Sequence, residues 1–358
     1  MFYRETGQFK TSYDADQAVF PIFQDRVFIW GVIAVAFFGV PWFIDDYWAN
    51  AILLPFLIYA LAAIGLNILT GYCGQLSLGT GAFLAVGAYA SYKFTTAFPE
   101  LNLIVVFLLS GAAAAAVGTL FGLPSLRIKG FYLAVATLAA QFFIIWLFYK
   151  VPWFYNYNAT GQISVPSRDL FGFRVTGAEA RPAVEYLVTL SIVCVFAIVA
   201  KNIVRGHIGR SWMAIRDMDI AAELIGIRPL RTKLLAFGVS SFYIGVAGAL
   251  MFAIWLGAAE SGETFGIDQS FQVLFMIIIG GLGSILGSFL GAAFIVLMPI
   301  LLKNMLVDGF AMTAVFAKHI EIMTMGVLII SFLIAEPQGL ARLWQIAKEK
   351  LRLWPFPH

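Results

Sequence analysis

Long apolar segments recur along the chain, and several of them are uninterrupted by charge. Leu101–Leu123 contains no Asp, Glu, Lys or Arg, and neither does Ile285–Leu302. A helix needs about 20 apolar residues to cross the hydrocarbon core of a bilayer. Hydrophobic residues make up 61% of the 358 residues and charged residues 12%, against about 25% charged in soluble domains. The segments are continuous and not alternating, which excludes a β-barrel. We expect an all-α polytopic membrane protein.

About ten segments are expected to cross or enter the membrane. They are Val27–Ile44, Ala51–Leu69, Gly81–Phe98, Leu101–Leu123, Phe131–Tyr149, Tyr186–Ala200, Leu234–Ala259, Phe271–Gly280, Ile285–Leu302 and Ile320–Ala335. The eighth is too short to span a bilayer, so we expect broken or re-entrant helices, and eight or nine passes stay possible. This membrane domain, 27–340, lies between a polar segment, 1–26, and a basic tail, 341–358.

The distribution of Lys and Arg predicts the orientation. With the N-terminus inside and ten passes, the inside segments hold 16 of the 23 Lys and Arg residues. Cytoplasmic loops carry such an excess in membrane proteins, so both termini are expected inside. The polar segment 150–185 is then an ordered external loop, and the charged segment 201–233 is a cytosolic loop. Cys73 and Cys194 lie in or beside apolar runs without Cys-x-x-Cys spacing, which indicates packing thiols.

The cytosolic loop contains a pattern for one short amphipathic helix. Met218, Ala221, Ala222 and Ile225 are spaced i, i+3, i+4 and i+7, which is one face of a helix. Asp217 is the expected N-cap, and Gly226 is the expected end of this helix. A small apolar face in a cytosolic loop is suited to docking in the groove of another protein. The alternative is a loop that only anchors the neighbouring helices, with basic residues that reflect the usual excess of Lys and Arg in cytoplasmic loops.

Two glycine-rich stretches, one in each half of the chain, interrupt the apolar segments. Both contain the pattern Gly-x-x-Ser, and their candidate path residues are Gly74, Gln75, Ser77, Thr80, Gly281 and Ser284. Non-helical backbone at membrane depth is tolerated only where protein buries it or water lines it. The breaks therefore predict a solute path near the midplane, unless the glycines only let helices approach. Asn67 and Gln141 are expected to form hydrogen bonds between helices.

Deep inside the predicted segments there is no Asp or Glu; Glu185, Glu260 and Glu321 lie at segment ends. Ionisable groups inside a membrane are costly and are kept for function. Their absence from the sequence of the apolar segments argues against a proton-coupled carrier, although sodium coupling through backbone carbonyls stays possible.

Four motifs occur in order and carry a family resemblance. They are GYCGQLSLGTGAFLAVGAY, LRIKGFYLAVATL, RSWMAIRDMDIAAELIGI with TKLLAFGVSSFYIGVAGAL after it, and IIIGGLGSILGSFLGAAF. Over residues 45–340 the chain resembles the M-type permease subunit of the branched-chain amino acid importers of the ABC superfamily. The related urea-importer permeases share much of this pattern. Two departures concern the solute: Thr80 stands where the family often has His, and Ala159-Thr160-Gly161-Gln162 replaces a Thr-Gly-Gly pattern.

The resemblance implies a permease of a prokaryotic inner membrane that translocates branched-chain or related amino acids. Its implied partners are a second homologous permease, two ATPase subunits and an external binding protein, within a lipid bilayer and without nucleic acid. ATP belongs to the ATPase subunits, because this chain has no GxxxxGK[ST] motif, and no cofactor, metal or catalytic residue is expected here. The residues expected to couple the chain to the ATPase are Arg216, Asp217, Ala221, Ala222, Glu223 and Gly226.

Two other classes of protein stay open at this point. One is a self-sufficient carrier or channel for a small polar solute such as urea or an amide, with segment 201–233 as a plain anchor. The other is a membrane scaffold without transport, which the paired helix breaks disfavour. Substitution of Glu223 or Gly226 should uncouple transport from ATP hydrolysis only in the ABC importer.

Overall fold

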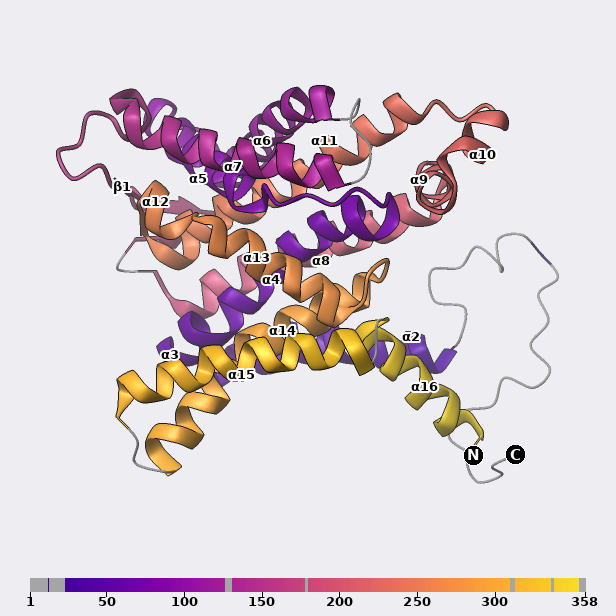
Figure 1. The fold of residues 1–358 in the computed structure, drawn as a ribbon. Coiled ribbons are helices and arrows are strands. Elements are labelled where there is room, and N and C mark those ends of the chain that lie inside the picture. Colours follow the sequence, from indigo (N-terminus) through magenta and orange to yellow (C-terminus); the bar gives the residue numbers. More distant parts are fainter. Residues whose placement is uncertain are drawn as a thin grey trace.

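The computed structural model describes residues 12, 23–125, 131–177, 180–309, 313–335 and 338–353. It consists mainly of helices (Figure 1). The helices are α2 Phe23–Ala34, α3 Asp46–Trp48, α4 Leu54–Asn67, α5 Thr80–Ala97, α6 Leu103–Ser125, α7 Phe131–Lys150, α8 Pro182–Arg205, α9 His207–Asp217, α10 Asp219–Leu224, α11 Pro229–Leu250, α12 Ser261–Thr264, α13 Ile267–Gly280, α14 Ile285–Lys303, α15 Ala314–Ala335 and α16 Gly339–Leu353. Short π- and 3-10-helical turns extend several of them, so that α3 and α4 form one helix to Tyr72 and α11 continues to Leu256.

Seven helices among the described residues are long and apolar enough to cross a membrane. The all-α polytopic architecture is therefore confirmed. The other three predicted segments also form helices, α5, α13 and α15. Helix α13 has 14 residues, fewer than the about 20 that a full crossing needs. The count of ten passes stays a prediction.

Helices α4 and α11 form the centre of the bundle. Every residue from Leu57 to Asn67 in α4 is buried, and so is every residue from Tyr243 to Leu250 in α11. The sequence of α4 is apolar on all sides, which is typical of a helix surrounded by other helices. Helices α5, α6, α8, α13 and α14 pack around this pair.

Small residues allow α5, α6 and α11 to approach closely. A Cβ atom added to Gly111 in α6 would lie 2.6 Å from Val246 Cγ2 in α11. The run Gly111–Val117 is therefore part of a tight helix interface, as its small residues predict. In α11, a Cβ on Gly248 would lie 2.0 Å from the carbonyl oxygen of Leu84 in α5.

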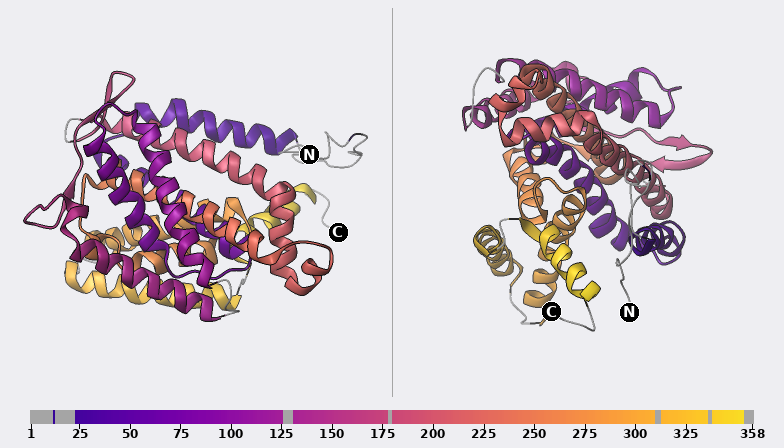
Figure 2. Two further views of the ribbon diagram at one scale, coloured as in Figure 1. Left: turned by 90° about the horizontal axis from the view of Figure 1, so that it is seen from above. Right: turned by 90° about the vertical axis from the view of Figure 1, so that its right-hand side faces the viewer.

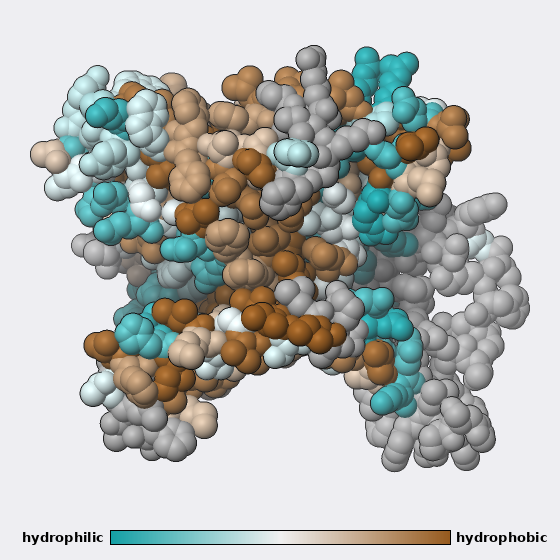
Figure 3. Space-filling view, in the orientation of Figure 1, coloured by the Kyte–Doolittle hydropathy of each residue, from teal (hydrophilic) through white to brown (hydrophobic). Residues whose placement is uncertain are grey.

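The two ends of the bundle differ in structure. Helices α9, α10 and α16 and the start of α2 lie at one end, and the β-strands lie at the other, in Figure 1 and in the left view of Figure 2. At the first end, Lys348 Nζ of α16 lies 3.1 Å from Asp25 Oδ2 of α2. Space-filling colour shows hydrophilic residues gathered at these ends and apolar residues between them (Figure 3). This band matches a bilayer.

Segment 150–185 is ordered in its described residues, as the sequence predicts. It contains a short 3-10 helix, and the strands β1 Ile163–Ser164, β2 Arg168–Leu170 and β3 Phe173–Thr176. β2 and β3 form an antiparallel hairpin, and β1 pairs with β4, Ala258–Ala259. The pairing fixes this loop to the segment that follows α11.

Candidate functional site

The first predicted helix break is present. After the last turn of the α4 helix, residues Cys73–Gly79 run without helix until α5 begins at Thr80. Gly74 has φ +71°, a left-handed conformation that glycine adopts without steric cost. Gln75 is half-buried, and its carbonyl oxygen accepts a hydrogen bond from Thr70 Oγ1 at 3.1 Å. A side chain of the preceding turn thus fixes the start of the break.

Polar side chains from other helices accept hydrogen bonds from the backbone N–H groups at the buried start of α5. Ser270 Oγ of α13 accepts a hydrogen bond from Gly81 N at 2.8 Å, and Gln141 Oε1 of α7 accepts one from Ala82 N. Gln141 Nε2 also donates to the carbonyl oxygen of Phe265 at 2.9 Å. Gln141 therefore joins three segments, and its predicted role between helices is confirmed. The free N–H groups at a helix start are satisfied here by partners far away in sequence.

Ser77 and Thr80 lie within this buried polar region. Both side chains are at most 1% exposed. Ser77 Oγ lies 3.4 Å from Gly79 N, whereas Thr80 Oγ1 has no hydrogen-bond partner among the described residues. An unpaired buried hydroxyl costs about 1–3 kcal/mol. Thr80 is thus one of several buried hydroxyl groups without a hydrogen-bond partner among the described residues.

The second glycine stretch is a turn between two antiparallel helices. It joins α13 to α14, whose backbones are close enough that a Cβ on Gly291 would lie 1.8 Å from the carbonyl oxygen of Met276. Ser284 is the N-cap of α14, and its Oγ accepts a hydrogen bond from Gly287 N at 3.0 Å. Gly281 lies 11 positions after Ser270 in the chain, which corresponds to about 16 Å along a helix. Gly281 and Ser284 are thus distant from the buried region around Thr80.

Asn67 joins this turn to the end of α4. Its Nδ2 donates to the carbonyl oxygens of Ser284 at 2.9 Å and Gly281 at 3.3 Å, and to Ser288 Oγ at 3.0 Å. Its Oδ1 accepts a hydrogen bond from Gly283 N at 2.8 Å. Asn67 is 1% exposed, so its predicted role between helices is confirmed. The end of α4 and the α13–α14 turn therefore meet, although more than 200 residues separate them.

Arg216, at the end of α9, reaches the same place. Its Nη1 donates to the carbonyl oxygen of Gly71 at 3.1 Å. A Cβ on Gly71 would lie 2.3 Å from Gly283 N, so the two backbones touch. We call the assembly of Asn67, Gly71, Gly74, Arg216 and the turn Gly281–Ser284 the glycine junction. It lies beside α9 and α16, at the end of the bundle that carries α10 (Figure 1).

Replacing Asn67 with leucine is expected to lower stability, because it removes the hydrogen bonds to the turn. The Gly283 N–H would lose its partner, at a cost of about 1–3 kcal/mol. The measurement is thermal unfolding of the purified chain in detergent. Asn202→Leu is the matched control, because Asn202 is exposed in α8. Equal unfolding temperatures for the two variants would contradict this role of Asn67.

The loop after α9 forms the predicted short helix with different ends, and of its predicted apolar face Met218, Ala221 and Ile225 are exposed. Asp217 is not its N-cap: it is the last residue of α9, and Met218 occupies the N-cap position of α10. Asp217 instead pairs with Arg216, with Nη2 and Oδ1 2.9 Å apart. Gly226 follows the helix with φ +91°, so its expected place just after the helix is confirmed.

The exposed apolar surface of α10 includes residues that the pattern did not identify. Ala222 is buried at 2% exposure, whereas Ala221 and Glu223 are exposed. Leu224 is 84% exposed, Ile225 74% and Ile220 65%. The i, i+3, i+4 spacing included neither Leu224 nor Ile220. A six-residue helix therefore presents large apolar side chains beyond the end of the bundle.

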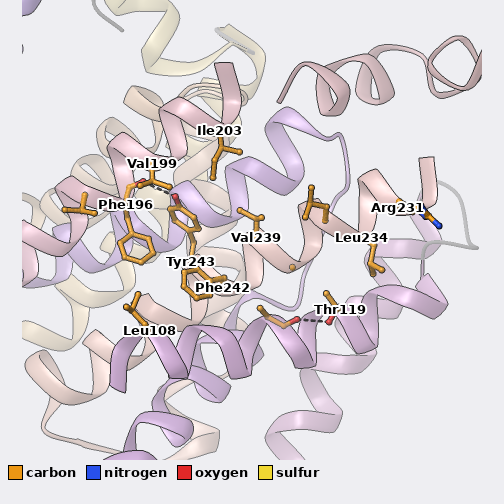
Figure 4. A pocket seen from close by; sticks show the side chains of 14 residues that line it. Leu108, Thr119, Phe196, Val199, Ile203, Arg231, Leu234, Val239, Phe242 and Tyr243 are labelled. Atoms are coloured by element: carbon orange, nitrogen blue, oxygen red, sulfur yellow. Dashed lines mark hydrogen bonds between the residues drawn. The ribbon is translucent and has the colours of Figure 1, made fainter. Parts of the chain in front are cut away.

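An apolar groove of about 760 Å³ lies between α6, α8 and α11 (Figure 4). Its polar groups are already used: Tyr243 donates its hydroxyl hydrogen to the carbonyl oxygen of Phe196 at 3.0 Å, and Thr119 Oγ1 bonds to Ala115 O at 2.9 Å. Arg231 is the charged residue of the lining. This groove suits apolar molecules and offers little to a polar solute.

Comparison with known proteins identifies the family. The family model of the permease component of branched-chain amino acid transport systems matches residues 49–335. The high-affinity branched-chain amino acid transport permease LivM of Salmonella typhimurium is 31% identical over 79% of this chain and 68% of its own length. Escherichia coli LivM is 32% identical over the same shares. A probable LivM of Methanocaldococcus jannaschii is 24% identical over 81% of this chain and 92% of its own length. No solved structure gives a significant match. The chain belongs to the family of permease components of branched-chain amino acid transport systems.

Proposed function

We propose that this chain is the permease subunit of an ABC importer that moves branched-chain or related amino acids across a prokaryotic inner membrane. It pairs with a second, homologous permease, and each permease contacts one of two ATPase subunits that bind and hydrolyse ATP. An external binding protein delivers the solute. The names of the LivM relatives support the solute class.

The exposed apolar surface of α10 is the observation that carries this proposal. Large apolar side chains on a short helix outside the bundle are typical of a helix that docks in a groove of another protein. We assign Arg216, Asp217, Ala221, Ala222, Glu223 and Gly226 to this coupling segment. The end that carries α10 faces the cytosol, with both termini inside, because segments 201–233 and 342–352 together hold 11 of the 23 Lys and Arg residues.

We assign the solute path to the first break and the residues that meet it. Gln75, Ser77 and Thr80 supply polar groups, and Gly74 allows the backbone to turn. Gly281 and Ser284 form the part of the path nearest the coupling helix. The unpaired hydroxyl of Thr80 supports this assignment, because a bound amino acid could supply the hydrogen-bond partner that this hydroxyl lacks.

Replacing Thr80 with valine is expected to reduce transport without reducing stability. Valine keeps the shape of the side chain and removes an unpaired hydroxyl, which is nearly neutral or stabilising. Loss of a hydrogen bond to the solute should raise the KM for transport by about fivefold to tenfold, as expected for about 1 kcal/mol. Initial uptake rates in proteoliposomes measure this, with Thr96→Val as control, because Thr96 is exposed at the end of α5. An unchanged KM in the Thr80→Val variant would show that Thr80 does not contact the solute.

The proposal is tested by purifying the tagged chain from its native membrane in mild detergent. The expected result is that a homologous permease and ATPase subunits copurify and are identified by mass spectrometry. Proteoliposomes of this complex with the binding protein should accumulate leucine only when ATP is present on the ATPase side. A chain that is purified alone and moves solute without ATP would overturn the proposal in favour of a carrier or channel.

A further inference from the structure

The side chain of Arg216 lies among three glycines of the glycine junction. Its Nη1 donates to the carbonyl oxygen of Gly71 at 3.1 Å. A Cβ on Gly74 would lie 2.9 Å from Arg216 Cγ, and one on Gly283 would lie 3.4 Å from Nη1. Both Gly74 and Gly283 have positive φ. The two glycine stretches therefore leave a space that this arginine fills.

The contacts use all three nitrogens of the guanidinium group. Nε and Nη2 each lie 2.9 Å from Asp217 Oδ1, and Nη1 points to Gly71. Gly71 is in the last turn of the α4 helix, where carbonyl groups lack partners within the helix and a cation is favoured. Lysine has one nitrogen and cannot reproduce this fixed arrangement of donors. Asp217 thus orients the arginine toward the end of α4.

Arg216 is also close to the coupling helix along the chain. Only Asp217 and Met218 stand between it and α10, and Met218 is extended, with φ −160° and ψ 100°. A shift of α10 therefore reaches Arg216 through two residues. Beyond Gly71, the hydrogen bonds of Asn67 connect α4 to the α13–α14 turn. The contacts form one continuous path from α10 to both glycine stretches.

We propose that Arg216 is the positioning residue that transmits movement of α10 to the two glycine stretches, and that it is not a contact residue for the ATPase. This rests on the proposed function, because it requires an ATPase docked on α10. When the docked helix moves, the bond from Arg216 to Gly71 moves the end of α4 against the α13–α14 turn.

The test is Arg216→Met in the complete complex, reconstituted with the binding protein in proteoliposomes. Solute transported per ATP hydrolysed is expected to fall by about fivefold or more, as for the loss of one hydrogen bond worth about 1 kcal/mol. Copurification of the ATPase subunits and their ATP hydrolysis should persist. Arg216→Lys should restore part of the ratio. Arg210→Met is the matched control, because Arg210 is an exposed arginine of the same helix.

A second readout follows the junction itself. Cys73 is 1% exposed, next to Gly74, and Cys194→Ala leaves it as the single thiol of the chain. In that background, alkylation of Cys73 is measured without nucleotide and after ATP hydrolysis with vanadate, which traps ADP on the ATPase subunits. The rate should depend on nucleotide with Arg216 present. With Arg216→Met, this dependence should disappear while the ATPases stay bound.

These measurements distinguish a failure of the inference on Arg216 from a failure of the proposed function. Loss of ATPase copurification in Arg216→Met would show that Arg216 is a docking contact and would overturn the inference. Unchanged transport per ATP, with Cys73 still responding to nucleotide, would overturn it too. If the unsubstituted chain itself neither binds ATPases nor needs ATP, the proposed function fails, irrespective of Arg216.

Discussion

Replacing Gly248 with alanine is expected to destabilise the chain severely. A Cβ at this position would lie 2.0 Å from the carbonyl oxygen of Leu84 and 2.7 Å from its Cα. These are backbone atoms of α5, so no side-chain rotation relieves the overlap, and α5 and α11 must separate. We expect a loss of about 3 kcal/mol or more, at the upper end of the costs of overpacking. Helix association in a membrane depends on such packing.

The measurement is the unfolding temperature and the elution profile of the purified variant in detergent. Gly31→Ala is the control, because Gly31 is inside α2 and has no atom within 4 Å of an added Cβ. There, alanine should be neutral or stabilising by about 0.5–1 kcal/mol, since glycine is a poor helix former. If both variants unfold at the same temperature, the close approach of α5 and α11 is wrong.

The helices themselves could be predicted from the sequence, but their ends could not. Apolar runs identified α4, α6, α8 and α11, but the segment predicted for α11, Leu234–Ala259, begins five residues after the helix start at Pro229 and ends within β4. Helix α8 extends to Arg205, five residues past its predicted end at Ala200. Hydropathy falls at a charged residue, whereas backbone hydrogen bonding continues through it. Proline at the first position of α8, Pro182, likewise favours a helix start that hydropathy does not detect.

The coupling segment shows why a local pattern can be correct in type and wrong in detail. Asp217 has the right side chain and position for an N-cap. In the structure it pairs with Arg216 and ends α9. The sequence offers no sign of this competition, because the second partner of Arg216 is the carbonyl oxygen of Gly71, 145 residues away. The glycine junction could not be predicted for the same reason. The sequence identifies the glycines, but which of them come into contact depends on long-range packing.

Replacing Leu224 with aspartate is expected to separate the chain from its ATPase subunits. Leu224 is 84% exposed at the end of α10, so a carboxylate there should leave the fold of the permease unchanged. In a docked complex the same side chain would be buried against the ATPase, and a charge would lose its hydration without a partner. If Leu224 is a hot spot of this interface, its loss should cost about 2 kcal/mol or more, a factor of about thirty in affinity.

Copurification of the ATPase subunits and ATP-driven leucine uptake measure this effect, and both should fall together. Phe171→Asp is the matched control: Phe171 is 81% exposed, but it lies in the β2–β3 hairpin at the opposite end of the bundle. That variant should keep its ATPases. Retention of the ATPases by the Leu224 variant would mean that α10 is only an anchoring loop. Loss in both variants would mean that exposed apolar side chains stabilise the complex nonspecifically. Only loss with Leu224 alone places the contact on α10, since the two substitutions introduce the same charge at similar exposure.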